Sequence, residues 1–301
     1  MIKLFTHTDL DGVGCAILAK LAFGDKVDIE YCNYDEINSK VEEFFNKGSE
    51  CECHITDISI NDELAYRIND SGKKYQLLDH HPTALRLNKF YWCDVRIENA
   101  DTHIQTSGTE LYYKWLVKNH YLEDRDVLNR FVELVTNYDT WRWSTLGEDG
   151  FICKQVNTLL YIYGRDRFID WCILDISINL FPRLRDSDRL ILEIEQRTID
   201  DYVEAKNKQL FIGDLCGRTC GFVFAEKYFS ELGNRLCQMH PEIDFVAMID
   251  MDGKVSYRTI KDDINLGEDV AKQFGGGGHL KAAGSQFSKE TRMDIIKKIF
   301  E

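Results

Sequence analysis

Three short polar segments of this chain each follow directly after an apolar run, and this arrangement restricts the folds open to it. The paired runs and segments are Ile2–Phe5 with 7–12, Cys51–Ile55 with 56–57, and Lys74–Leu78 with 79–81. Short buried runs that end in polar residues are typical of strands in a parallel sheet. Because ligands of open α/β sheets bind outside the carboxyl ends of the strands, we expect the three segments to lie at one edge.

Helical patterns alternate with these strands. The expected helices are Gly12–Phe23, Glu36–Asn46 and Asn61–Ile68, and a further strand is expected at Val27–Tyr31. This alternation predicts an α/β fold with an N-terminal parallel sheet and helices on both of its faces. Helices are also expected at Thr109–Lys118 and Leu128–Asp139, and over most of 165–208. Residues 150–185 are apolar and aromatic-rich, but no motif indicates their role.

The pattern changes after about residue 210, which predicts a second, smaller α/β domain with a mixed sheet. Its expected strands are Arg218–Ala225, Asp244–Ile249 and Lys254–Thr259, and its expected helices are Ser230–Gln238, Leu266–Phe274 and Lys289–Ile299. The turn Met251-Asp252-Gly253 between two of these strands predicts a hairpin. The division expected is therefore a catalytic domain at 1–185, a linker helix at 186–208 and a substrate-binding domain at 209–301.

Composition restricts the partners and the location of the chain. A formal net charge of −14 argues against binding of long duplex nucleic acid, but a short phosphate substrate held by metal ions avoids that repulsion. No apolar run is long enough for a membrane helix, and the acidic N-terminus does not resemble a signal peptide. We expect a cytoplasmic protein without membrane contact, in which the ten cysteines are reduced thiols.

Six side chains offer nitrogen or oxygen ligands suited to two divalent metal ions. They are His7, Asp9, Asp11, Asp57, His80 and Asp139, the last of which lies in a helical pattern. Ligands of this kind without thiolate favour Mn²⁺ or Mg²⁺ over structural zinc. Four carboxylates match the charge of two such ions and would repel one another without them. The alternatives are that Asp11 or Asp57 caps a helix and that the histidines are ordinary loop residues.

The motifs HTDLDG, ITD, DHH and YDTW, in this order, resemble the four motifs of the DHH phosphoesterase superfamily. The segment GGGGHLKAAG at 275–284 resembles the signature of the associated DHHA1 domain. The resemblance extends from His7 to Gly284. In size and layout, the chain resembles the bacterial nanoRNases, which degrade short oligoribonucleotides, and the related pAp and cyclic-dinucleotide phosphatases.

The resemblance implies a role for each of these residues. The first metal ion would be held by His7, Asp9 and Asp57, and the second by Asp11, Asp57, His80 and Asp139. Asp57 would bridge the two ions, with Mn²⁺ expected and Mg²⁺ as the alternative. Water activated by both ions would attack phosphorus. Of the two catalytic residues, His81 would lie beside the scissile phosphate and Asp79 would orient a histidine.

The second domain is expected to bind the substrate. Arg258 stands where the family has a substrate-binding arginine, and a guanidinium can form a bidentate contact with phosphate. Gly276, Gly277 and Gly278 would let backbone N–H groups approach a phosphate, and His279 could donate to it. A glycine run alone is more often a flexible loop. Near Asp139, the aromatic residues Tyr138, Trp141 and Trp143 could stack on a base, but their spacing is more typical of a core.

The expected function is hydrolysis of short oligoribonucleotides to nucleoside 5′-monophosphates. The alternatives are a pAp phosphatase or a linear or cyclic dinucleotide phosphodiesterase, an inorganic pyrophosphatase or polyphosphatase, and a non-catalytic nucleotide binder. The pyrophosphatase alternative would require several cations in the second domain, and the candidates are Arg258, Lys261 and Lys281. The expected partner is a short RNA or a dinucleotide, and a homodimer is left open.

Overall fold

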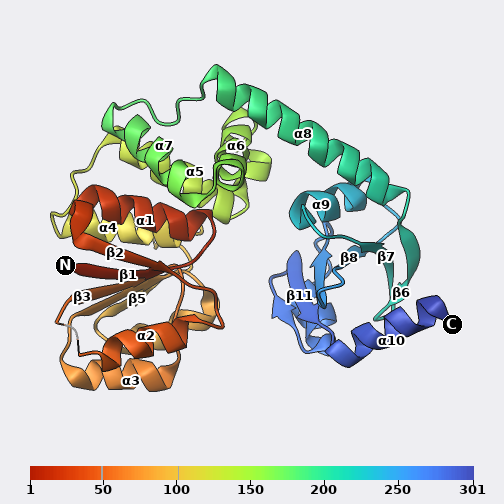
Figure 1. The fold of residues 1–301 in the computed structure, drawn as a ribbon, viewed down its shortest axis with the longest axis horizontal. Coiled ribbons are helices and arrows are strands. Elements are labelled where there is room, and N and C mark those ends of the chain that lie inside the picture. The colour runs from red at the N-terminus through yellow and green to blue at the C-terminus, as the bar shows by residue number, and fades with distance from the viewer. Residues whose placement is uncertain (49, 101) are drawn as a thin grey trace. The chain divides into compact units, whose positions relative to one another are not determined.

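The computed structural model describes residues 1–48, 50–100 and 102–301, and it divides into two units, Met1–Leu192 and Glu193–Glu301. The first unit contains a five-stranded sheet in the order β2-β1-β3-β4-β5, in which every pairing is parallel (Figure 1). The strands are β1 Ile2–Thr6, β2 Val27–Tyr31, β3 Glu52–Thr56, β4 Tyr75–Asp79 and β5 Cys93–Val95. The expected parallel sheet is confirmed. The short strand β5 was not expected, because three residues carry no readable period.

Helices cover both faces of this sheet, as expected (Figure 1). Consecutive strand residues point to opposite faces, so Leu4 packs into one core and Phe5 into the other. The first core involves α1 Leu10–Phe23, α4 Gly108–Lys118, α5 Asp126–Asp139, α6 Glu148–Tyr163 and α7 Arg165–Ser177. The second core involves α2 Ile37–Asn46, α3 Asp62–Ser71 and the 3₁₀ turns of η2 Pro82–Lys89.

The aromatic-rich segment at 150–185, for which the sequence indicated no role, forms most of α6 and all of α7. Phe168 and Trp171 of α7 are buried in the same core as Phe131 of α5. Phe181 lies against both Phe131 and Trp171, with ring centroids 5.2 and 5.6 Å away. The aromatic side chains of this segment therefore contribute to the core of the first unit.

The division between the units falls inside the long helix α8, Asp186–Asn207. At its start, Asp188 accepts a hydrogen bond from Tyr163, and Leu192 packs into the core of the first unit. Further along, Ile199 and Val203 belong to a core of the second unit. The helix thus contributes residues to both units, and the predicted division into two domains joined by a separate linker helix at 186–208 stays a proposal.

The second unit contains a six-stranded mixed sheet in the order β10-β11-β9-β8-β7-β6. Its strands are β6 Phe211–Leu215, β7 Arg218–Phe224, β8 Phe245–Ile249, β9 Lys254–Arg258, β10 Gly277–Gly278 and β11 Ala282–Gln286. The β7–β8 pairing is parallel and the other pairings are antiparallel. The mixed sheet and the β8–β9 hairpin are confirmed. The helices are α9 Phe229–Met239 and α10 Lys289–Phe300.

The helix expected at Leu266–Phe274 is two short helical turns instead. A π-helical turn covers Leu266–Val270, and a 3₁₀ turn covers Ala271–Phe274. At Val270, φ is −124° and ψ is −68°, so the backbone leaves the α-helical region between the two turns. The apolar residues Leu266, Val270 and Ala271 are still buried, which explains why the sequence pattern resembled a helix.

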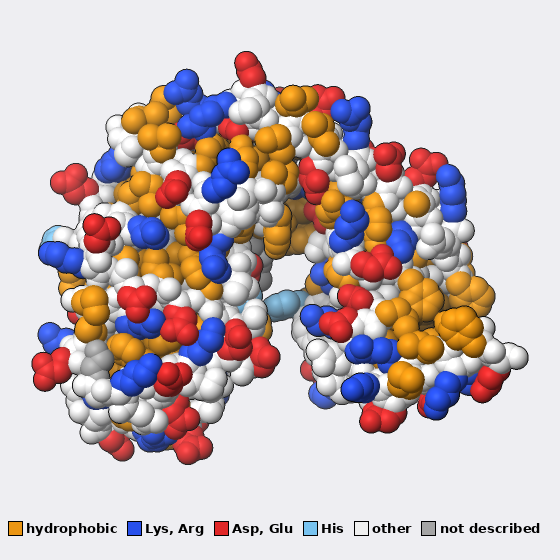
Figure 2. Space-filling view, viewed as in Figure 1, with side chains coloured by type: hydrophobic (Ala, Val, Ile, Leu, Met, Phe, Trp, Pro, Cys, Tyr) orange, Lys and Arg blue, Asp and Glu red, His pale blue; other side chains and the backbone are white. Residues whose placement is uncertain are grey.

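Acidic and basic side chains are interspersed on the face of each unit shown in Figure 2. Among the described residues, no helix has the length and apolar character needed to cross a membrane. All ten cysteines are free thiols, and seven of them are buried.

Candidate metal centre

The three strands β1, β3 and β4 lie side by side, and the polar segments after them meet at their carboxyl ends. The six candidate ligands lie at these strand ends, at the start of α1 and at the last residue of α5. Two compact groups result, one of His7, Asp9 and Asp57 and another of Asp11, His80 and Asp139. Within each group the ligand atoms all lie within 4.8 Å of one another. The expected convergence at one sheet edge is therefore observed.

In the first group, His7 and Asp9 are close together at the start of α1. The Nδ1 atom of His7 lies 2.8 Å from Oδ2 of Asp9, while Oδ1 of Asp9 accepts the backbone N–H of Gly12 and caps the helix. Burial disfavours the charged forms of both side chains, but the contact between them has the larger combined effect on their pKa values. The pKa of His7 therefore lies above its ordinary value, and the pKa of Asp9 falls to about 2. The helix cap is thus Asp9, and not Asp11.

In the second group, Asp11 is held by the first turn of α4. Its Oδ2 accepts the backbone N–H of Gly108 at 2.6 Å, and its Oδ1 accepts that of Thr109 at 2.8 Å. A helix N-terminus favours negative charge, so this contact keeps a carboxylate in a buried position. The Nε2 atom of His80 lies 3.7 Å from Asp11 Oδ2 and 3.5 Å from Asp139 Oδ2.

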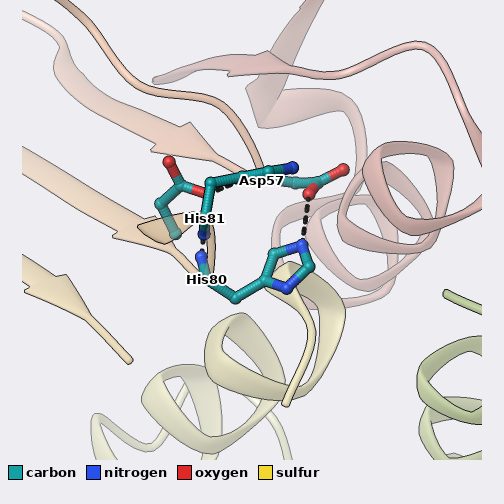
Figure 3. A group of neighbouring side chains, drawn as sticks. Asp57, His80 and His81 are labelled. Carbon is teal, nitrogen blue, oxygen red and sulfur yellow. Dashed lines mark hydrogen bonds and ion pairs between the residues drawn. The ribbon is translucent and has the colours of Figure 1, made fainter. Parts of the chain in front are cut away.

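Asp57 joins the two groups through its two carboxylate oxygens. Oδ1 lies 3.3 Å from Nε2 of His80, and Oδ2 lies 3.9 Å from Nδ1 of His7. Figure 3 shows the His80 ring turned toward the Asp57 carboxylate. Asp57 has a φ of 57°, which is rare for a residue with a side chain, and it does not cap a helix because α3 starts later, behind the cap Asn61.

The carboxylates of Asp57 and Asp139 are unfavourable as buried anions. Burial, and then the neighbouring charges of Asp11 and Asp9, raise the pKa of both groups well above the ordinary value. Asp57 is 1% exposed and follows directly after the last residue of β3. A cation placed among these groups would remove the repulsion, since opposite charge favours the ionised form.

The spacing and the hydrogen bonding of the ligand atoms are suited to divalent cations. Three of them, His7 Nδ1, Asp57 Oδ2 and His80 Nε2, are buried and make no well-directed hydrogen bond among the described residues, although His7 Nδ1 and His80 Nε2 lie close to the carboxylates of Asp9 and Asp57. Two ligands of an octahedral ion lie at about 2.1 Å from it and hence about 3 Å apart, which is close to the spacings between these atoms. Asp57 belongs to the first group and contacts His80 of the second, and the two metal-ligand sets that the sequence resemblance implies stay a prediction.

Asp79 and His81 form a hydrogen-bonded pair beside these groups. Oδ1 of Asp79 accepts Nδ1 of His81 at 2.7 Å, and it also accepts the backbone N–H groups of His80 and His81. Burial opposes charge on both side chains. The contact nevertheless raises the pKa of His81 and lowers that of Asp79. Because Nδ1 is engaged, Nε2 is the ring nitrogen of His81 available to a further partner.

That further partner is Tyr34, which the sequence did not indicate. Its hydroxyl lies 3.0 Å from Nε2 of His81, and its ring centroid lies 5.0 Å from that of His7. Tyr34 belongs to the turn between β2 and α2 and is 57% exposed. Gly108 and Thr109 were also missed as the donors to Asp11. The capping pattern formed by Ser107 and Glu110 marks the start of α4 but does not reveal what its amides bind.

In the second unit, Arg258 is a part-buried cation at the last residue of β9. Its Nη1 donates to the carbonyl of Tyr257 at 2.8 Å, its Nη2 donates to Ser230 Oγ at 3.3 Å, and its Nε is buried without a hydrogen-bond partner. Among the described residues no carboxylate forms an ion pair with it. Burial lowers the pKa of the guanidinium. Ala282 pairs with Arg258 across β9 and β11, and it accepts the backbone N–H of His279 at 2.8 Å.

The glycine run before His279 has structural reasons of its own. A Cβ at Gly276 would lie 2.0 Å from the carbonyl oxygen of Gly284, and Gly278 has a φ of +147°. By contrast, a Cβ at Gly277 would meet nothing within 4 Å. Close packing between β10 and β11 therefore explains Gly276 and Gly278, and Gly277 is the member of the three with open space before it.

The aromatic residues around Asp139 divide into two kinds. Tyr138 and Trp143 stack on each other and pack against the core of the first unit. Trp141 is 41% exposed and has a φ of 63°. The core role expected from the spacing thus holds for two of the three residues.

Comparisons with known proteins give the following results. No family model matches the chain. Oligoribonuclease NrnB of Bacillus subtilis (strain 168) is 38% identical over 311 aligned residues, which cover 100% of this chain and 76% of the relative. A 3′,5′-cyclic-nucleotide phosphodiesterase of Helicobacter pylori (strain ATCC 700392 / 26695) is 24% identical over 329 residues, covering 93% and 91%. A solved structure of exonuclease RecJ bound to manganese has a TM-score of 0.63 and 14% identity, covering 99% and 88%, which shows a shared fold.

Proposed function

The chain belongs to the DHH phosphoesterase superfamily as a relative of oligoribonuclease NrnB, and we propose that it hydrolyses very short oligoribonucleotides to nucleoside 5′-monophosphates. It is a phosphoric ester hydrolase. The observation that carries the proposal is Asp57, whose two oxygens face His7 on one side and His80 on the other. Such an arrangement suits two-metal phosphoryl chemistry, and simple nucleotide binding would not require it.

The residues that would hold two divalent cations, with Mn²⁺ as the expected ion, are the six candidate ligands. His7 and Asp9 would serve one cation, Asp11, His80 and Asp139 the other, and Asp57 both. When bound, the cations would lower the pKa of a water molecule and neutralise charge on the phosphoryl group. The manganese in the RecJ structure and the unpartnered ligand atoms support this choice.

The chain's own residues would orient the phosphate. Asp79 accepts Nδ1–H of His81 and thereby fixes the ring so that Nε2 faces the hydroxyl of Tyr34. We assign this Nε2 to a hydrogen bond with a phosphate oxygen. The hydroxyl of Tyr34, which lies at this atom, would then move aside or share the contact. Asp11 is fixed by the amides of α4, so its carboxylate needs no rearrangement.

We propose that the substrate is bound by Arg258, by the glycine run Gly276–Gly278 and by His279. Within the glycine run, Gly277 is the residue with open space next to it. The part-buried guanidinium supports Arg258, because its Nε makes no hydrogen bond and no carboxylate pairs with it among the described residues, so a phosphate could supply both. Replacing Arg258 with Gln should mainly raise KM for short RNA. Arg197, which is exposed on α8 and has no ion pair among the described residues, provides the control, and Arg197→Gln should leave KM unchanged. An unchanged KM for Arg258→Gln would remove it from the substrate site.

Among the alternatives, hydrolysis of pAp or of linear or cyclic dinucleotides would use the same centre. The relative named as a cyclic-nucleotide phosphodiesterase keeps this alternative in view. The pyrophosphatase alternative has less support, because two of its three expected cations already have partners. Lys261 is paired with Asp244 and Lys281 with Asp262.

A substrate panel separates these possibilities. The purified protein with Mn²⁺ would be given 5′-phosphorylated RNAs from dimers to long single strands, pAp, cyclic dinucleotides and pyrophosphate. Fast cleavage of the shortest RNAs and slow cleavage of long ones is the expected result. Pyrophosphate as the sole good substrate would refute the proposal. The cytoplasmic location stays a prediction, and the homodimer stays open.

A further inference from the structure

A pocket between α4 and α5 of the first unit is lined by none of the candidate metal ligands. Its volume is about 490 Å³, and it is formed by residues of the two helices, by Asp124 between them and by Arg142 after α5. Pockets that bind small ligands in proteins usually measure roughly 300–1,000 Å³. The space is therefore suited to a molecule of the size of a nucleotide.

A buried amide lines this pocket without a hydrogen bond of its own. Asn137 is 2% exposed, and its Oδ1 is buried and lacks a hydrogen-bond partner. Buried polar groups in proteins are nearly always paired, because leaving one unpaired is costly. By contrast, the buried amide of Asn157 in the same unit donates to the hydroxyl of Tyr138 at 2.8 Å. The unpaired amide of Asn137 indicates a ligand that offers a complementary polar edge.

Two cations of the pocket lining are available to an anionic ligand. The three carboxylates that line it are each engaged by neighbouring side chains: Glu110 by Lys114, Glu133 by Arg130, and Asp124 by Tyr113 and Asn129. The lining cations Lys118 and Arg142 have no ion pair within the described part of the chain. The three lining carboxylates and the three lining cations balance in formal charge, and Lys118 and Arg142 are the lining cations left for an anionic group.

We propose that this pocket binds a nucleoside monophosphate at a site separate from the metal centre. The amide of Asn137 would pair with the edge of the base, as Asn does with bases in other complexes. The apolar side chains of Val117 and Val132 would lie against the base or ribose, and Arg142 and Lys118 would receive the phosphate. The proposal does not rest on the phosphodiesterase function.

Helix geometry separates this site from the metal centre. Asn137 and Asp139 lie two residues apart on α5, so their side chains are rotated about 200° from each other around the helix axis. Asp139 points toward His80, whose Nε2 lies 3.5 Å from it. The ligand of Asn137 is therefore not the phosphate that the metal centre would bind.

Calorimetric titration of the full chain with adenosine monophosphate tests the proposal, both with Mn²⁺ and after its removal by chelation. We expect binding that persists without Mn²⁺ and that Asn137→Leu weakens about tenfold, the equivalent of one base-edge contact. Arg142→Gln should weaken the binding of adenosine monophosphate but leave the binding of adenosine unchanged. Ribose 5-phosphate serves as a further ligand that reports the phosphate contact alone. Arg197→Gln is the matched control. Binding that requires Mn²⁺, or that Asn137→Leu leaves intact, would overturn the proposal.

Measurements of stability and turnover show whether a loss of binding results from misfolding of the variant. Asn137→Leu removes no hydrogen bond to any residue that the structure describes, so its melting temperature should match that of the wild type. Asn157→Leu, which loses its bond to Tyr138, should melt at a lower temperature. Hydrolysis of short RNA by Asn137→Leu should be unchanged at low product concentration, and a raised KM would instead assign the pocket to the substrate path. If Asn137→Leu fails to fold, the selective effect of Arg142→Gln alone decides.

Discussion

The metal centre of the first unit and the glycine run of the second are both crowded, but the crowding has different causes. At the metal centre, Asp57 is buried beside like charges, has a φ of 57° and leaves Oδ2 without a hydrogen-bond partner. In the glycine run, Gly276 packs against the carbonyl of Gly284, directly beside the pairing of the strands β10 and β11.

The difference distinguishes a feature that folding explains from one that it does not. Strain and unpaired polar groups without a local benefit cluster at functional sites, because only a ligand compensates for them. Close packing of glycines needs no ligand, because the packing itself stabilises the fold. The metal centre is therefore the stronger indication of chemistry, and variants in the two regions should behave differently.

The largest effect is expected at Asp57. Asp57→Asn preserves the shape, and Asn tolerates the left-handed conformation better than Ala does. Loss of the shared ligand should lower kcat roughly 10³-fold, the equivalent of several kcal/mol. Without metal, the variant should melt at the wild-type temperature or above, since one buried acid is removed. Asp201→Asn, an exposed change on α8, is the control, and near-normal turnover by Asp57→Asn would contradict the assignment.

A smaller effect is expected at Gly108, which carries no charge. A Cβ there would lie 2.5 Å from the Cβ of Asp57 and 3.0 Å from Oδ2 of Asp11. Gly108→Ala should therefore displace both carboxylates and lower kcat by roughly 10- to 100-fold. Ala favours helices more than Gly does, so helix propensity cannot explain a loss. Steady-state kinetics with a short RNA and Mn²⁺ titration measure it, and unchanged values would show that the centre tolerates displacement.

The next smaller effect is expected for Tyr34→Phe, which tests the contact between Tyr34 and His81. The change removes the hydroxyl at Nε2 of His81 but keeps the ring near His7. We expect kcat to fall about tenfold, the value of one modest hydrogen bond, with the Mn²⁺ affinity unchanged. Tyr91, which is 84% exposed, supplies the control Tyr91→Phe. A rise in turnover would instead mean that Tyr34 obstructs the phosphate.

The smallest effect on activity is expected in the glycine run. Gly276→Ala should lower the free energy of unfolding by about 1–3 kcal/mol through overpacking against Gly284, while turnover of the folded protein stays close to normal. Gly277→Ala, with open space before it, should leave stability unchanged, so any rise in its KM would report a substrate contact. Denaturant titration of both variants checks the contrast. Equal stability of the two would contradict the packing account.

Much of the metal centre could be predicted because each part is local in sequence. An apolar run followed by His7, Asp57 or His80 identifies a strand end, and adjacent strands of a parallel sheet bring such ends together. Contacts between distant segments could not be predicted. Tyr34 and His81 lie 47 residues apart, and Asp11 and Gly108 lie 97 apart, so packing alone decides these pairs. The helix expected at Leu266–Phe274 failed because burial of Val270 was compatible with an irregular backbone.

The central claim is that Asp57 joins two cation sites. Anomalous scattering from crystals grown with Mn²⁺ tests it most directly, because the ion positions are seen independently of activity. The account predicts two manganese peaks, one next to each oxygen of the Asp57 carboxylate, with His7 beside the first and His80 beside the second. A single peak, or peaks that do not contact Asp57, would contradict it.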